Sequence, residues 1–273
     1  MTDRYAVVGN PIGHSKSPLI HATFASQTGQ DMAYEAIEAA PGRFKDGVDA
    51  FRKAGGRGIN ITAPFKLDAF AYATHHSERA KLAGAANCLK FGGQRIDAEN
   101  FDGVGLVNDI VRNLAVAMAD RHVLLLGAGG AARGALLPFL AQKPAALTVV
   151  NRDITKARAL VRDAKATESV RVCGYRDLNG ACFDLVVNAT SASLRAELPP
   201  VPATVFRNGA LAYELVYGKG LTPFLRLAQN AGVGRLADGV GMLVEQAAEA
   251  FAWWRGVSPQ TSSLIEKLSV PLV

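Results

Sequence analysis

A lysine and several short polar residues stand where secondary-structure elements are expected to end. The first group is the segment Asn60-Ile61-Thr62-Ala63-Pro64-Phe65-Lys66, in which Pro64 stops further strand pairing. Asn87 follows a Gly-Ala-Ala turn, and Asp102 follows another asparagine. A lysine ammonium can donate a proton, and a nearby carboxylate can pair with it. One lysine alone is usually a solvated surface group, but α/β proteins gather ligand contacts at element ends, so we expect Lys66 to face a cleft.

A glycine-rich segment indicates a dinucleotide site. The run Gly127-Ala128-Gly129-Gly130-Ala131-Ala132 directly follows the apolar strand expected at His122–Leu126 and opens a helix. The first glycine permits a tight turn, the second lets the backbone approach a pyrophosphate, and Ala132 is small enough for helix–strand packing. The helix N-terminus adds N–H donors and a positive dipole.

The end of the next strand bears on the choice of nucleotide. The strand expected at Leu147–Val150 is followed by Asn151 and Arg152. An arginine here suits a 2′-phosphate, so the sequence favours NADP over NAD. Asp153 would repel that phosphate if its side chain pointed inward, but it could instead cap the following helix.

The order of expected elements predicts a two-domain α/β protein. Short β-rich runs alternate with helical patterns over the first hundred residues, and a second α/β series begins after a helix expected over Val104–Met118. Ser17 followed by Pro18 is typical of an N-cap and a first helical residue, so the loop Gly9–Ser17 leads into a helix N-terminus that can hold an anion. Leu243, Ala247, Ala250, Phe251 and Trp254 form one stripe of a late helix, as expected of a face packed on a core.

Composition excludes several classes of protein. Of the 273 residues, 49% are hydrophobic and 20% are charged, which is enough apolar surface for a sizeable core. The net charge of +6 comes from scattered basic residues, so we expect small anionic ligands rather than nucleic acid. The apolar runs are too short for a transmembrane helix or a secretory leader, so a cytoplasmic protein with no membrane partner is expected. Three cysteines, Cys88, Cys173 and Cys182, have no CxxC spacing, which argues against disulfides and structural zinc. We expect all three to be small buried residues, and we expect no metal.

Dispersed, ordered motifs over essentially the whole chain resemble the shikimate dehydrogenase family. The opening loop, the lysine segment and the aspartate region match first, followed by the glycine loop, the Asn-Arg pair and the strand end that contains Thr190. The quoted matches are Gly9-Asn10-Pro11-Ile12, His14-Ser15, Ser17-Pro18, His21, Asn60, Thr62, Pro64-Phe65-Lys66, Ala85, Asn87, Asn100, Asp102-Gly103, Gly127, Asn151-Arg152, Lys156-Ala157, Asn188-Ala189-Thr190-Ser191, Tyr217, Asp238-Gly239, Met242-Leu243 and Gln246.

The resemblance implies a reversible, NADPH-dependent reduction of 3-dehydroshikimate to shikimate in aromatic biosynthesis. Lys66 would deliver a proton to the developing oxyanion, and Asp102 would pair with Lys66 and with a substrate hydroxyl. The implied substrate contacts are Ser15, Ser17, Asn60, Thr62, Asn87, Tyr217 and Gln246. The implied cofactor contacts are Gly127, Gly129, Gly130, Ala131, Asn151, Arg152, Lys156, Thr190 and Gly239.

The resemblance also implies a domain division and a fold. Residues 1–102, with the C-terminal helices at 241–273, would form an α/β substrate-binding and catalytic domain. Residues 103–240 would form an NADP-binding, Rossmann-like domain with a doubly wound parallel sheet. We expect a monomer or a homodimer.

The chain departs from the family pattern near the predicted site, and these departures leave alternatives open. Cys88 and Phe101 stand where threonine is common, Ala98 stands where glycine is common, and Asp153 replaces a threonine often associated with the 2′-phosphate. Phe101 could reshape the substrate pocket or merely pack backward. An NAD-preferring quinate or shikimate dehydrogenase, or a catalytically impaired nucleotide-binding module, therefore remains an alternative.

Several predicted contacts also have structural explanations. Ser15 and Ser17 could be turn and cap residues, and the asparagines at 60 and 87 could satisfy buried backbone groups. Gln246 could be an exposed residue of an amphipathic helix.

Overall fold

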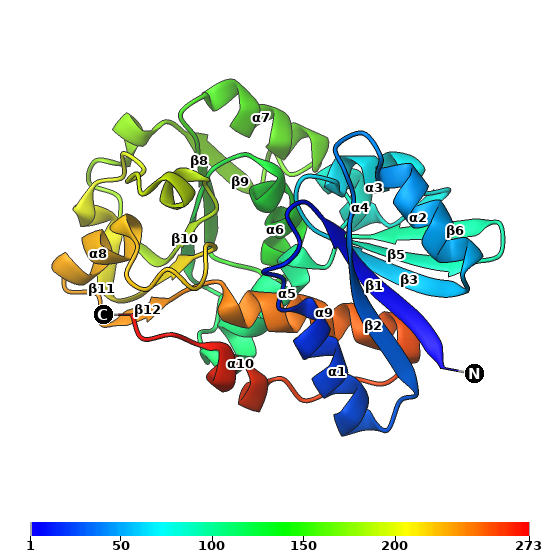
Figure 1. Cartoon of the computed structure of the whole chain (residues 1–273). Coiled ribbons are helices and arrows are strands. Elements are labelled where there is room, and N and C mark those ends of the chain that lie inside the picture. The colour runs from blue at the N-terminus through cyan, green and yellow to red at the C-terminus, as the bar shows by residue number, and fades with distance from the viewer. Residues whose placement is uncertain (1, 273) are drawn as a thin grey trace. The chain divides into compact units, whose positions relative to one another are not determined.

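The structure, a computed structural model, describes residues 2–272 and divides into two compact units (Figure 1). The first unit contains the chain up to Gly105 together with Val244–Leu264, and the second contains Leu106–Leu243 and the chain from Ile265 onward. The divisions fall inside helices α5 (Asp102–Asn108) and α9 (Val240–Arg255). The sequence predicts that residues 241–273 belong with the N-terminal domain, whereas the chain after Leu264 belongs to the second unit. The predicted α/β fold class is confirmed.

The first unit is built on a mixed sheet in the order β2-β1-β3-β5-β6-β4. Its parallel part is β2-β1-β3, while β5 runs antiparallel to both β3 and β6. The strands are β1 (Asp3–Gly9), β2 (Met32–Glu38), β3 (Gly56–Ile61), β4 (His75–His76), β5 (Cys88–Gly92) and β6 (Arg95–Glu99). The helices besides α5 and α9 are α1 (Ser17–Thr28), α2 (Phe44–Lys53), α3 (Lys66–Tyr72) and α4 (Glu78–Ala83).

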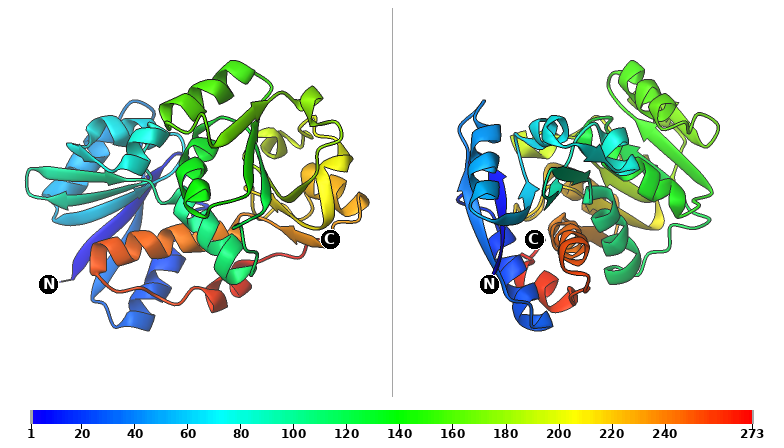
Figure 2. Two further views of the ribbon diagram at one scale, coloured as in Figure 1. Left: turned by 180° about the vertical axis from the view of Figure 1, so that it is seen from behind. Right: turned by 90° about the vertical axis from the view of Figure 1, so that its right-hand side faces the viewer.

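The alternation of side chains along β1 explains why both faces of this sheet are covered. Ala6 and Val8 pack with residues of α2, including Phe44 and Val48. On the other face, Tyr5 stacks on Trp254 of α9 at a centroid distance of 4.7 Å. Helix α1 joins α9 through an edge contact between Phe24 and Phe251. Figure 2 shows these helices from two further directions.

The second unit contains a fully parallel sheet in the order β12-β11-β10-β7-β8-β9. Read from β9, this is the 3-2-1-4-5-6 order of the doubly wound fold, and its topological switch point lies between β7 and β10. Ligands of such folds bind beyond the carboxyl ends of the strands at that point. The strands are β7 (His122–Leu126), β8 (Ala146–Val150), β9 (Val170–Cys173), β10 (Phe183–Asn188), β11 (Phe206–Glu214) and β12 (Arg235–Ala237). The helices are α6 (Gly130–Ala141), α7 (Ile154–Asp163) and α8 (Pro223–Asn230), with α10 (Ser262–Leu268) crossing the unit boundary.

Three local expectations are wrong. Lys16 is the residue that precedes α1, and it has right-handed helical dihedral angles, so Ser17 is the first helical residue and not the N-cap. The helix expected over Val104–Met118 begins at Asp102 and ends in a π-helical turn, Asp109–Asn113, because the chain then turns with a positive φ at Ala115. Cys182 is exposed, whereas Cys88 and Cys173 are buried as expected.

Among residues 2–272, no helix combines the length and apolar character needed to cross a bilayer. Over the same range, no group of three or more histidine, cysteine and acidic side chains is placed to hold a metal ion.

Candidate functional site

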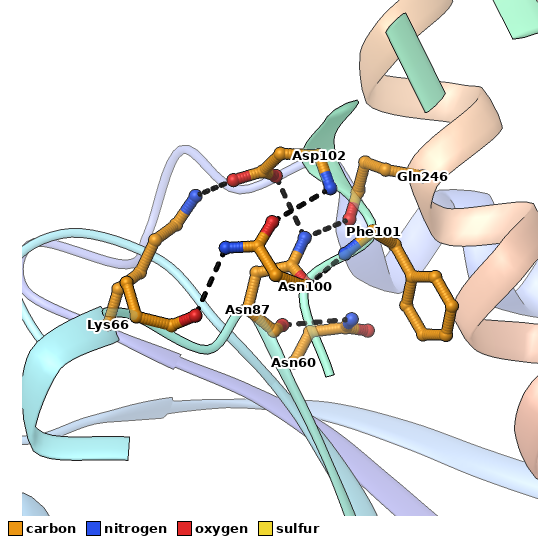
Figure 3. Close-up of polar contacts among 8 residues, drawn as sticks. Asn60, Lys66, Asn87, Asn100, Phe101, Asp102 and Gln246 are labelled. Carbon is orange, nitrogen blue, oxygen red and sulfur yellow. Dashed lines mark hydrogen bonds and ion pairs between the residues drawn. The ribbon is translucent and has the colours of Figure 1, made fainter. Parts of the chain in front are cut away.

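A lysine–aspartate ion pair lies in the first unit (Figure 3). The Lys66 Nζ and Asp102 Oδ2 atoms are 2.6 Å apart, and the Lys66 side chain is more exposed than that of Asp102, at 36% against 15%. Lys66 is the first residue of α3, reached from β3 by a short turn, and Asp102 is the first residue of α5, directly beyond β6. A carboxylate at a helix N-terminus is stabilised by the helix dipole. The pair therefore presents a proton donor held by a partly buried anion.

Asn87 connects this pair to helix α9. Its amide Nδ2 donates to Asp102 Oδ1 at 2.8 Å and to Gln246 Oε1 at 3.2 Å. Its Oδ1 accepts from the Phe101 backbone N–H at 2.9 Å, which fixes the orientation of the amide group. Figure 3 shows Lys66, Asn87, Asp102 and Gln246 gathered in one place. Four residues that the sequence singled out for substrate and proton chemistry are thus brought together.

Asn100 has a structural role beside this group. Its Oδ1 accepts from the Asp102 backbone N–H at 3.2 Å, and its Nδ2 donates to the Ala85 carbonyl at 3.1 Å. These bonds hold the turn from which α5 begins. Asn100 therefore orients Asp102 through the backbone.

Asn60 is held by the hydroxyl of Tyr34, whose ring stacks on His21, a contact that the sequence does not predict. The Tyr34 hydroxyl donates to Asn60 Oδ1 at 2.7 Å, and Asn60 Nδ2 donates to the Asn87 carbonyl at 3.4 Å. His21 stacks on Tyr34 with ring centroids 4.2 Å apart and planes 7° apart. No hydrophobic period or motif marks Tyr34. Its strand, β2, pairs only with β1 and lies two strands from β3, which carries Asn60, so the sequence does not reveal this contact.

His21 is a fully buried and neutral histidine. Both of its ring nitrogens lack a hydrogen-bond partner among the described residues, and burial lowers its pKa to about 3. Burial likewise raises the pKa of Tyr34 well above its usual value, and a hydrogen bond with the Ser17 side chain acts against that rise. Tyr34 thus bonds to one predicted substrate residue, Asn60, and is influenced by a second, Ser17.

The opening loop lies against the lysine turn. The Asn10 N–H donates to the Ala63 carbonyl at 3.1 Å, and a Cβ atom at Gly9 would lie 2.4 Å from the Thr62 side chain, so only glycine permits this approach. In the loop, Ser15 Oγ accepts from the Ser17 N–H at 3.3 Å. Ser15, Ser17 and Thr62 therefore belong to the same unit as Lys66. Tyr217 belongs to the second unit, where it is 42% exposed, and its substrate contact stays a prediction.

The large residue beside Asp102 packs backward. The Phe101 ring is 4% exposed and lies in a cluster with Tyr5, Cys88 and Trp254. Its edge contact with Trp253 has a centroid distance of 5.7 Å. Phe101 and Cys88 thus pack in the same apolar cluster, and Phe101 contacts Asn87 of the site through its backbone N–H.

A basic cavity of about 410 Å³ lies at the carboxyl end of the second unit's sheet. We call it the nucleotide cavity, and its lining includes most of the predicted nucleotide contacts near the strand ends. Its lining residues are Ala128, Gly129, Asn151, Arg152, Asp153, Lys156, Tyr175, Thr190, Ser191, Ala192, Arg195, Pro199 and Pro200.

The glycine turn has the geometry that the sequence predicts. Gly127 has φ of +109°, and a Cβ atom there would lie 3.1 Å from the Ala189 carbonyl oxygen. Cβ atoms at Gly129 and Gly130 would meet nothing within 4 Å, so a ligand can approach the backbone at the start of α6. Open, unblocked backbone at a helix N-terminus fits a pyrophosphate.

Asp153 is the N-cap of α7. Its carboxylate accepts from the Thr155 N–H at 3.0 Å and from the Thr155 hydroxyl at 2.5 Å, and these bonds lower its pKa. Neither Arg152 nor Lys156 forms a salt bridge with any residue of 2–272. Two cations are thus available beside a carboxylate that is engaged in capping.

The segment that contains Thr190 is anchored by a buried acid. Thr190 donates through both its N–H and its hydroxyl to Asn188 Oδ1, at 3.1 and 2.7 Å. Asn188 Nδ2 donates to the fully buried Glu214 at 2.8 Å, and burial raises the pKa of Glu214. A Cβ atom at Gly239 would lie 2.1 Å from the Leu215 carbonyl, so Gly239 is required for close packing whether or not it contacts a cofactor.

The doubly wound sheet with its glycine turn and basic cavity, in one chain with a lysine–aspartate pair, defines a class of protein. This combination is typical of a nicotinamide-dependent dehydrogenase with a separate substrate domain.

Matches to known proteins specify the family. Residues 7–89 match the "Shikimate dehydrogenase substrate binding domain", residues 109–196 match "Shikimate / quinate 5-dehydrogenase", and residues 239–268 match the "Shikimate 5'-dehydrogenase C-terminal domain". The chain is 55% identical to the shikimate dehydrogenase (NADP(+)) of Nitrosospira multiformis over 98% of both chains. It is 54% identical to that of Chromobacterium violaceum, also over 98% of both chains. The chain belongs to the shikimate dehydrogenase family.

Solved structures agree with this family. An Ael1 enzyme from Pseudomonas putida is 60% identical over 100% of both chains, with a TM-score of 0.97. Shikimate 5-dehydrogenase from Thermus thermophilus, in complex with NADP(H) and shikimate, is 30% identical and has a TM-score of 0.84. That match covers 97% of this chain and 98% of the other.

Proposed function

We propose that the protein is a shikimate dehydrogenase that reversibly reduces 3-dehydroshikimate to shikimate with NADPH. The observation that carries this proposal is the 2.6 Å ion pair between Lys66 and Asp102, joined through Asn87 to Gln246. The high identity to relatives named shikimate dehydrogenase (NADP(+)) supports the same reaction.

Lys66 would donate the proton, and Asp102 would hold Lys66 in position. Reduction of a carbonyl places negative charge on its oxygen, and an ammonium within hydrogen-bond reach stabilises that charge and then donates a proton. Asp102 holds the ammonium and can also accept from a substrate hydroxyl, while Asn87 keeps Asp102 in place. In the reverse direction, the neutral amine of Lys66 would accept the hydroxyl proton and become the ammonium again, while Asp102 holds it in place.

The remaining polar residues suit a small polyol carboxylate. Ser15, Ser17 and Tyr217 would bind the carboxylate through neutral donors. Asn60, Thr62, Asn87 and Gln246 would orient the other carboxylate and hydroxyl contacts. Because amides and hydroxyls both donate and accept, such a set reads several hydroxyl groups without adding charge.

The nucleotide cavity fits NADP. Gly129 and Gly130, where the backbone is open, would hold the pyrophosphate together with Ala131, after the turn at Gly127. Asn151, Arg152 and Lys156 would hold the 2′-phosphate. Thr190 and Gly239 would complete the set. When bound, the nicotinamide supplies or accepts the hydride. These residues would form the NADP-binding part of the second unit, and the first unit would supply the substrate contacts other than Tyr217.

The compartment and the assembly are also part of this proposal. Two buried thiols and one exposed thiol, all unpaired, suit a reducing cytoplasm. We propose a monomer or a homodimer, which sedimentation of the purified protein distinguishes.

One set of assays tests the proposal against its alternatives. Purified protein is given shikimate or quinate with NADP or NAD, and kcat/KM is measured for each of the four combinations. The proposal predicts the highest value for shikimate with NADP. A higher kcat/KM for quinate or with NAD would favour the alternative of an NAD-preferring quinate or shikimate dehydrogenase. Binding of both ligands without turnover would indicate an impaired nucleotide-binding module.

A further inference from the structure

An ion pair stands at the rim of the nucleotide cavity and has no place in the motifs described above. Arg195, which lines the cavity, donates from Nε to Glu197 Oε1 at 3.0 Å and from Nη2 to Oε2 at 2.9 Å. Its remaining Nη1 donates to Ser191 Oγ at 3.3 Å. The guanidinium is therefore oriented by contacts on both sides.

The backbone between the two partners forces them together. Arg195 ends a short 3₁₀ helix, Ala192–Arg195, and Ala196 follows with φ of +54°. A left-handed backbone is less stable for alanine than a right-handed one, because the Cβ atom approaches the following carbonyl oxygen. Two hydrogen bonds from the Ala196 N–H, to the Ala192 and Ser193 carbonyls, stabilise the turn.

Two further cations line the same cavity as Arg195. Arg152 and Lys156 come from the segment after β8, whereas Arg195 comes from the segment after β10. The charge of Arg152 also acts on Glu197, although the Arg195 hydrogen bond is the main reason that the pKa of Glu197 is lowered. The Glu197 carboxylate is held 2.9 to 3.0 Å from the guanidinium of Arg195, which lines the cavity, and it is also within the field of Arg152, one of the two cations that would meet a 2′-phosphate.

We propose that Arg195 is a specificity-determining residue for the 2′-phosphate of NADP, acting by neutralising Glu197 at the rim of the nucleotide cavity. This inference rests on the proposed function, because it takes NADP as the cofactor. Without Arg195, Glu197 would be an unpaired carboxylate. It would compete with the 2′-phosphate for Arg152, and its negative charge would repel the phosphate. An NAD molecule lacks that phosphate and would not be affected.

Calorimetric binding of two nucleotide fragments tests the inference without catalysis. Adenosine 2′,5′-bisphosphate carries the 2′-phosphate, and adenosine 5′-monophosphate lacks it. The proteins are the unaltered chain, Arg195→Ala, Glu197→Gln, the double variant, and Arg226→Ala. The last removes an exposed arginine of α8 and is the matched control. Exposed ion pairs contribute little to stability, so all of these variants should fold, which circular dichroism checks.

The expected pattern is specific. Arg195→Ala weakens bisphosphate binding about tenfold and monophosphate binding less than about twofold, with the loss decreasing at high salt. Glu197→Gln tightens bisphosphate binding about two- to threefold, and adding it to Arg195→Ala restores most of the loss. The control binds both fragments as the unaltered chain does.

Two results would overturn the inference. One is an equal loss for both fragments in Arg195→Ala, or no loss. The other is failure of Glu197→Gln to restore binding in the double variant, which would mean that Arg195 does not act through Glu197. Failure to oxidise shikimate, with this fragment pattern intact, would refute the proposed function alone.

Discussion

The Lys66 ammonium lies 2.6 Å from the Asp102 carboxylate, although 36 positions separate the two residues in the chain. The separation is bridged by the sheet, in which β5 pairs with both β3, before the Lys66 turn, and β6, before Asp102. The ion pair therefore depends on the antiparallel half of the first unit's sheet.

Replacing the lysine tests its proposed role as proton donor. Lys66→Ala should lower kcat for shikimate oxidation by about 10²- to 10⁴-fold, the usual contribution of general acid–base catalysis. The KM for shikimate should change less than about threefold, because the interaction is strongest in the transition state. Steady-state kinetics measure both constants, with Lys53→Ala, an exposed lysine at the end of α2, as the control. An unchanged kcat would remove Lys66 from the mechanism.

The hydroxyl of Tyr34 should affect substrate binding through Asn60. Tyr34→Phe removes the bond to Asn60 Oδ1 and leaves a buried amide free to reorient. We expect the KM for shikimate to rise about tenfold while kcat changes less than about threefold. Tyr72→Phe, which removes a hydroxyl bonded to Asp49 and Arg52 in the same unit, is the control. Equal kinetics in the two variants would show that Tyr34 does not orient Asn60.

His21 should make the stability of the protein depend on pH. Its folded-state pKa of about 3 lies below the ordinary value of 6.5, so the unfolded chain takes up a proton first as pH falls. The stability contributed by neutral His21 is present above pH 6.5 and is lost progressively toward pH 3. Its aromatic neighbours are Phe24, Tyr34, Phe251 and Trp254, of which only Tyr34 titrates, far above this range.

Urea unfolding of His21→Phe measures this effect. Between pH 7.5 and 5.5, the unfolding free energy of the unaltered chain should fall by about 1.4 kcal/mol more than that of the variant. This is the free energy expected when the pH falls roughly one unit below the pKa that His21 has in the unfolded chain. Comparing the difference at the two pH values removes the effect of the substitution on packing. Parallel pH dependences would mean that His21 is protonated in the folded protein.

Asp153 should act as a helix cap and not as a selector of the nucleotide. Asp153→Ala should lower the midpoint of urea unfolding, whereas Asp153→Asn, which can still cap, should leave it nearly unchanged. Neither variant should change the ratio of NADP to NAD affinity by more than about threefold, because Arg152 and Lys156 remain. A tenfold gain in NADP affinity for Asp153→Asn would show instead that the carboxylate faces the 2′-phosphate.

Local patterns predicted the nucleotide turn well. The strand at His122–Leu126 is confirmed, and Gly127 adopts the positive φ that a tight turn requires. Such features depend on neighbouring residues in the chain, so the sequence carries them directly. The side-chain direction of Asp153 was undecided, because it depends on whether Thr155 offers donors to the carboxylate.

Contacts between distant segments were much harder to predict. The register of β2, β1 and β3 brings Tyr34 within hydrogen-bond distance of Asn60, and no local sequence pattern encodes that register. The backward packing of Phe101 depends on Trp253 and Trp254, far along the chain. Ser17 is not an N-cap because the backbone of Lys16 is already helical, which dipeptide preferences do not reveal.

Transfer of deuterium from labelled shikimate tests the central claim most directly. The substrate carries deuterium on the carbinol carbon that becomes the carbonyl, and the nucleotide product is analysed by mass spectrometry. We predict reduced NADP containing one deuterium, formed rapidly by the unaltered chain and far more slowly by Lys66→Ala. Absence of reduced NADP, or reduced NADP without the label, would contradict the account.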